Sequence, residues 1–73
     1  MAVYVEIAVR FSDNRQAQWF SSWLYRESYT NKSLSKDTVT VNLRSHSDRV
    51  VVVEEAKARG GTIVADNVQE DAD

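Results

Sequence analysis

The first eleven residues alternate between apolar and polar positions. The apolar side chains fall at every second place: Val3, Val5, Ile7, Val9 and Phe11. Successive side chains of a strand point to opposite faces of a sheet, so this period of two predicts a half-buried strand from Val3 to Phe11. The other face of this strand would carry Tyr4, Glu6, Ala8 and Arg10.

The period lengthens to that of a helix after Ser12. Asp13 can accept a backbone hydrogen bond at the start of a helix, and Gln16, three residues later, can complete a capping box. We therefore expect a helix that begins near Asp13 and runs to about Tyr29. Its apolar stripe, which should face the core, contains Ala17, Phe20, Trp23 and Leu24.

A polar segment separates this helix from the next alternating stretch. Residues 30–37 are rich in turn-forming residues, which predicts an exposed connection. Alternation resumes from Thr38 to Arg44, where Val39, Val41 and Leu43 occupy every second position. We interpret residues 38–44 as a second strand.

Four consecutive valines, residues 50–53, fit either a helix or a strand. A run of β-branched residues is weak evidence for a helix by itself. Three of the valines share one side of a helical wheel with Ala56: Val50, Val52 and Val53. Residues 54–59 have high helix propensity, and Gly60-Gly61 supplies a C-terminal stop. We favour a helix capped by the segment Ser45–Asp48.

The alternative interpretation makes Arg49 to Glu54 a strand that pairs with the preceding strand, followed by a two-turn helix. Both versions end in a strand over residues 62–65. Residues 67–73 contain too little apolar surface to bury, so we predict an acidic, disordered tail after a single domain of residues 1–66.

This pattern of elements predicts a small α+β domain. Two helices would cover one face of a three- or four-stranded sheet as a two-layer sandwich. The favoured order is βαβαβ, and the alternative order is βαββαβ, the ferredoxin-like arrangement.

Composition excludes several classes of site. The 73 residues include no cysteine and one histidine, His46, so we expect no metal site and no cofactor. The neighbours of His46 are Ser45, Ser47 and Asp48, which we interpret as helix-capping residues rather than a catalytic triad. Neither a signal peptide nor a membrane span is evident, and we expect a cytoplasmic, non-enzymatic protein.

Two surfaces are candidates for binding. The first is an aromatic patch on the outward side of the first helix, with Tyr25, Arg26 and Tyr29 and with Trp19 at its margin. The alternative interpretation is that Tyr25 and Tyr29 pack on the neighbouring loop of residues 32–36. Tyrosine, tryptophan and arginine dominate the energetics of protein interfaces. The second is the open face of the sheet, with Tyr4, Arg10, Asn42 and Arg44.

These surfaces predict binding rather than catalysis. The leading hypothesis is a regulator or inhibitor of another protein, of the accessory kind encoded by phages and mobile elements. A second hypothesis is single-stranded nucleic-acid binding on the open sheet. The net charge of −2, with four acidic residues among the last eight, is not typical of a dedicated nucleic-acid binder. A third is a subunit of an oligomeric enzyme whose site is shared between copies.

Overall fold

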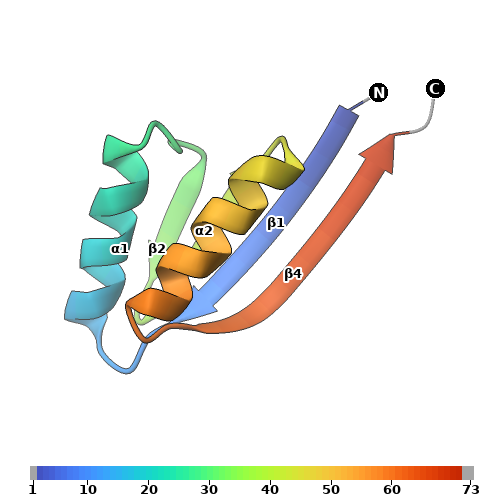
Figure 1. The fold of residues 1–73 in the computed structure, drawn as a ribbon. Coiled ribbons are helices and arrows are strands. Elements are labelled where there is room, and N and C mark those ends of the chain that lie inside the picture. Colours follow the sequence, from blue (N-terminus) through green and yellow to red (C-terminus); the bar gives the residue numbers. More distant parts are fainter. Residues whose placement is uncertain (1, 72–73) are drawn as a thin grey trace.

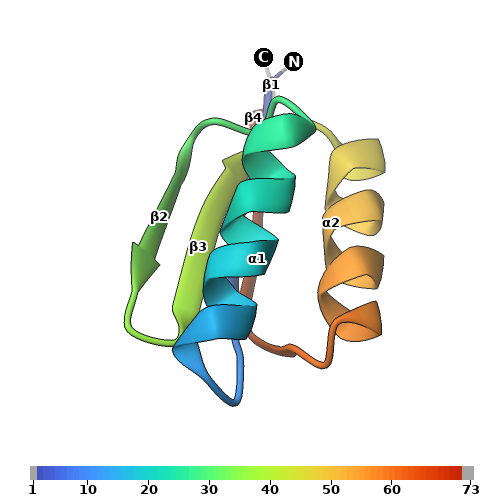
Figure 2. The same cartoon turned by 90° about the vertical axis from the view of Figure 1, so that its left-hand side faces the viewer.

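The computed structural model describes residues 2–71 and the side chains of residues 3–69. The elements follow in the order β1 (Ala2–Arg10), α1 (Asn14–Arg26), β2 (Lys32–Ser35), β3 (Thr38–Leu43), α2 (His46–Ala58) and β4 (Thr62–Asp71). The strands form one antiparallel sheet in the order β2-β3-β1-β4, and both helices lie on the same face of it (Figures 1 and 2). This arrangement is a ferredoxin-like two-layer sandwich.

The βαββαβ order arises by a different route from the one expected. Residues 46–58 form a helix, as favoured, and Arg49 to Glu54 is not a strand. The additional strand is β2, which lies inside the predicted connection of residues 30–37 and pairs with β3. Because β2 is a short edge strand with mostly exposed side chains, its residues have no need of an alternating apolar pattern.

β4 is longer than expected. It continues from Thr62 through Asp71 and pairs with β1 from Arg10, opposite Thr62, to Ala2, opposite Asp71, with one register shift between Ala8 and Val9. The predicted disorder from residue 67 onward is therefore wrong for residues 67–71, whereas residues 72 and 73 lie outside the described part of the chain. β3 pairs with β1 only as far as Val5, so beyond that point β1 and β4 form a two-stranded ribbon past the helices (Figure 1). Backbone pairing, rather than buried side chains, defines this end of β4.

The core lies between the sheet and the two helices. α1 packs over β2 and β3, and α2 packs over β1 and β4. The buried apolar side chains come from β1, β3 and both helices: Val5, Ile7, Val9, Phe11, Ala17, Phe20, Leu24, Val39, Val41, Leu43, Val52 and Ala56. The predicted inward side of β1 and the stripe of α1 are confirmed, with Trp23 only half-buried at the edge of this core. Val50, expected to face inward, is exposed.

α1 ends earlier than predicted, in a Schellman motif. Arg26 is its last residue, and Ser28 adopts a positive φ of 70°. The Tyr29 N–H donates to the Leu24 carbonyl at 2.8 Å, and the Ser28 N–H donates to the Tyr25 carbonyl at 3.1 Å. These two bonds satisfy carbonyls at the helix end and reverse the chain direction. Tyr29 consequently leaves the helix and turns back towards the core.

An ion pair fixes α2 against β4. The Arg49 Nε donates to Asp66 Oδ1 at 2.9 Å, and a second bond joins Arg49 Nη2 to Asp66 Oδ2. The hydrogen bonds from Arg49 lower the pKa of the Asp66 carboxyl below its ordinary value. The same bonds to Asp66 raise the pKa of the Arg49 guanidinium. The folded state therefore favours the ionised form of Asp66.

This ion pair predicts a pH dependence of stability. A carboxyl whose pKa is lower in the folded state stabilises above its unfolded pKa, about 3.9, and loses that contribution as pH falls through the folded value. In urea titrations at a series of pH values below about 5, the wild type should lose more unfolding free energy than Asp66→Asn. Glu54→Gln is the matched control, because Glu54 is exposed on α2 and makes no ion pair among the described residues. Equal acid sensitivity of the wild type and Asp66→Asn would contradict the expectation.

Candidate binding surfaces

The outer face of α1 exposes two aromatic side chains, Trp19 and Tyr25. It consists of six exposed residues on the side opposite the sheet: Arg15, Gln18, Trp19, Ser22, Tyr25 and Arg26. Trp19 is 59% exposed and Tyr25 is 68% exposed. At 100° per residue, the buried Phe20 and Leu24 direct the opposite side of the helix to solvent, with Ser22 at its centre. Three predicted interface residues, Trp19, Tyr25 and Arg26, thus share one face.

Tyr29, the fourth predicted interface residue, does not lie on this face. Its hydroxyl donates to Asp48 Oδ1 at 3.1 Å, and its ring centroid is 6.2 Å from that of Trp23. Partial burial, together with the hydrogen bond to Asp48, raises the pKa of Tyr29. Tyr29 therefore connects the end of α1 to the start of α2, and the outer face is defined without it.

The open sheet face brings together three of the four residues predicted there. The guanidinium of Arg44 lies 5.2 Å from the ring centroid of Tyr4, and Asn42 on β3 is directly opposite Glu6 on β1. These side chains border a hollow of about 680 Å³ that spans β3, β1 and β4. Its wall is largely polar, with a cation–π pair at one end.

β4 contributes four residues to this hollow that the sequence did not indicate: Asp66, Asn67, Val68 and Gln69. Two of them, Asn67 and Gln69, belong to the open face. They lie opposite Glu6 and Tyr4 in the register, on the same face of the sheet. Nothing in the sequence signalled them, because the polar residues of this segment do not alternate with buried apolar ones. The segment was therefore predicted to be disordered.

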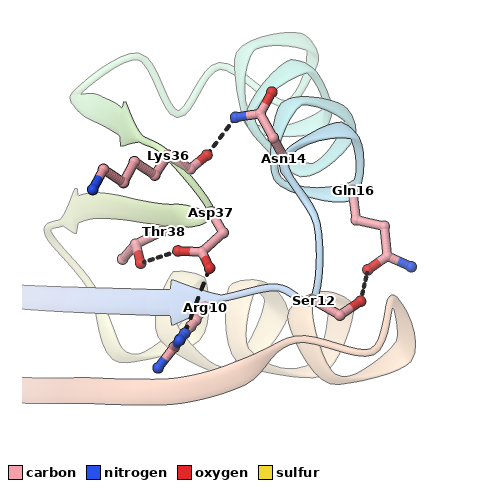
Figure 3. Close-up of polar contacts among 7 residues, drawn as sticks. All are labelled: Arg10, Ser12, Asn14, Gln16, Lys36, Asp37 and Thr38. Carbon is pink, nitrogen blue, oxygen red and sulfur yellow. Dashed lines mark hydrogen bonds and ion pairs between the residues drawn. The ribbon is translucent and has the colours of Figure 1, made fainter.

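Arg10, also predicted for the open face, lies at the other end of β1. Its Nε is 3.6 Å from Asp37 Oδ2 in the turn between β2 and β3 (Figure 3). The Thr38 hydroxyl donates to the other Asp37 oxygen at 3.2 Å, and the Asn14 side-chain amide donates to the Lys36 carbonyl. These contacts hold the turn, in which Lys36 has a positive φ of 55°, against the start of α1. Arg10 is part of this support rather than of the hollow.

The helix caps account for the remaining polar motifs. Gln16 N donates to Asp13 Oδ1 at 2.9 Å, as predicted, while the Gln16 side chain accepts from the Ser12 hydroxyl rather than returning to Asp13 (Figure 3). Asp48 N donates to the Ser45 hydroxyl oxygen at 3.1 Å, which confirms Ser45 as the N-cap of α2.

The described residues contain no group of three or more histidine, cysteine, aspartate or glutamate side chains placed to hold a metal ion. Within the same part of the chain, no helix has both the length and the apolar character needed to cross a membrane.

Comparison with protein-family models, curated proteins and solved structures gave no match to this chain. The outer face of α1 and the open sheet face are therefore the features from which a function can be inferred.

Proposed function

We propose that this chain is a non-enzymatic module that binds another protein through the outer face of α1. The observation that supports the proposal is the exposure of Trp19 and Tyr25 on a helix whose core side is already complete. We also propose that such binding serves a role as a regulator or inhibitor, of the accessory kind encoded by phages or mobile elements.

The side chains of the outer face are those expected of a surface that a partner covers, rather than of a surface that stabilises the fold of this chain. Aromatic side chains bury about 150–250 Å² each when they are covered, so their exposure to water is unfavourable. Trp19 and Tyr25 make no ring contact within the described residues, whereas Phe11, Phe20 and Trp23 pack on one another. Arg26 adds the third residue type that dominates interface hot spots.

The first experiment separates binding from stability. Trp19→Ala should weaken partner binding by about 2 kcal/mol or more, roughly thirtyfold. Because Trp19 is exposed, the same substitution should change the unfolding free energy by no more than about 0.5 kcal/mol. Affinity capture with the tagged protein, followed by titration of the recovered partner and by urea unfolding, measures both quantities.

Val50→Ala is the matched control for this test, since Val50 is an exposed apolar residue on α2. Its partner binding should equal that of the wild type. If Trp19→Ala and Val50→Ala recover the partner as well as the wild type does, the outer face of α1 is not the binding site.

A second candidate function is single-stranded nucleic-acid binding on the open sheet face. The supporting observation is the Tyr4–Arg44 pair beside the hollow, which offers an aromatic ring for base stacking and a cation for phosphate. Titration of the protein with a labelled oligonucleotide should then show affinity that falls with salt and falls again in Arg44→Gln. Binding that is absent, or insensitive to both changes, would exclude this function.

A further inference from the structure

The arginines of this chain fall into two groups. Four are engaged by other groups of the same chain: Arg10 by Asp37, Arg44 by the Tyr4 ring, Arg49 by Asp66 and Arg59 by Glu55. Among the described side chains, Arg15 and Arg26 make no ion pair, hydrogen bond or ring contact. Both belong to the outer face of α1.

These two arginines flank Trp19. At 100° per residue, Arg15, Trp19 and Arg26 fall within a stripe about 40° wide, and the arginine Cα atoms are about 16 Å apart along the axis. Trp19 lies between them, four residues after Arg15 and seven before Arg26. α1 itself contains no acidic residue, and its two acidic caps, Asp13 and Glu27, make no ion pair with either arginine in the described part of the chain.

We infer that the partner carries an acidic contact surface: an apolar pocket for the Trp19 indole with carboxylates on both sides that pair with Arg15 and Arg26. This inference rests on the proposed function. Arginine is suited to the pairing, because its guanidinium forms bidentate hydrogen bonds with carboxylates and is more weakly hydrated than lysine. Complementary charge at the rim would steer association and fix the orientation of the partner.

An acidic protein surface fits better than nucleic acid at this site. A phosphate backbone is bound by an array of cations, whereas this stripe has two on a chain of net charge −2. The central position of a tryptophan is instead typical of the apolar anchor of a protein interface, with charged residues around it.

A random-peptide display library tests the inference with a defined probe. The wild-type protein is the target, and Trp19→Ala serves for counter-selection. We expect the enriched peptides to place aspartate or glutamate on both sides of apolar residues. Binding of the best peptide should weaken by at least about tenfold in the double variant Arg15→Gln/Arg26→Gln. It should also weaken as salt rises from about 50 to 300 mM.

Lys57→Gln is the matched control, because it removes a positive charge from the exposed side of α2. This variant should bind the peptide as the wild type does. Trp19-dependent peptides that are neutral or basic, or that bind the double arginine variant unchanged, would overturn the acidic partner but leave the proposed function standing. A library with no Trp19-dependent peptide would count against the proposed function itself. Oligonucleotide binding that requires Arg15 and Arg26 would also overturn the inference.

Discussion

Phe20→Ala is expected to lower the free energy of unfolding by about 3–5 kcal/mol. Phe20 is fully buried and lies at the centre of an aromatic cluster. Its ring centroid is 5.3 Å from that of Phe11 and 5.7 Å from that of Trp23, and the Trp23 ring stacks on it with an interplanar angle of 15°. Truncation removes both ring contacts and leaves a cavity between α1 and the sheet, because the surrounding strands can relax only in part.

This loss is large relative to the whole stability. A domain of 73 residues has an unfolding free energy of about 4–11 kcal/mol at the usual value per residue. Phe20→Ala should therefore unfold at a much lower urea concentration than the wild type. Urea titration followed by far-ultraviolet circular dichroism measures the change without depending on the Trp23 signal. Phe20→Leu, which keeps most of the volume, should lose less than half as much. A loss below about 1 kcal/mol for Phe20→Ala would show that the cluster is not a central part of the core.

The elements with a buried apolar face were predictable from the sequence. β1 and α1 have clear periods of two and 3.6, and the structure follows both. The helix at residues 46–58 was predictable despite its four valines, because helix formers and two glycines follow them. The helical wheel nevertheless placed Val50 on the inward side of this helix, whereas Val50 is exposed. Only Val52 is fully buried, since the helix packs on β1 and β4 through a narrow contact that also includes Ala56.

The elements held by backbone pairing were not predictable. β2 and the second half of β4 lie at the two edges of the sheet, where side chains are largely exposed and no apolar pattern is required. Asn67 and Gln69, which border the hollow on the open face, were missed for the same reason.

The residues of the outer face of α1 were predicted, except that Tyr29 was wrongly included beyond the end of the helix. Tyr25 and Arg26 followed from helical spacing, whereas Trp19, expected at the margin, is fully part of the exposed face. Tyr29 was misplaced because Ser28 ends the helix in a left-handed conformation that glycine usually adopts, so the sequence carried no stop signal there. A single backbone conformation thus removed one residue from the expected surface and made it a link between the helices.

Gly61→Ala is expected to destabilise the fold by about 1–3 kcal/mol or more. A Cβ at this position would lie 2.5 Å from Val9 Cγ1, 2.9 Å from Phe11 Cε1 and 3.0 Å from the Ala56 carbonyl oxygen. Two of these neighbours are buried core side chains and the third is helix backbone, which also accepts the Gly61 N–H at 2.8 Å. None can move away without disturbing the end of α2 or the core beneath it.

Gly60 provides the matched comparison, because the two glycines are needed for different reasons. Gly60 has a φ of +82°, and a Cβ at this position would have no neighbour within 4 Å. Gly60→Ala therefore introduces only backbone strain, of about 1–2 kcal/mol, whereas Gly61 is needed for space. Urea unfolding should rank Gly61→Ala as the more destabilising of the two. The reverse order would mean that backbone conformation, rather than packing, determines this turn.

Substitutions at Gly61 and Phe20 should also be coupled, because the Phe20 ring packs on Phe11 and a Cβ at position 61 would meet the same Phe11 ring. In Phe20→Leu, the smaller side chain gives the Phe11 ring room to shift away from a methyl group at position 61. The double variant Gly61→Ala/Phe20→Leu should then lose less stability than the sum of the single variants, by about 0.5 kcal/mol or more. Strict additivity would show that the Phe11 ring is fixed by its other neighbours, and that the strain at Gly61 is relieved by movement of α2 instead.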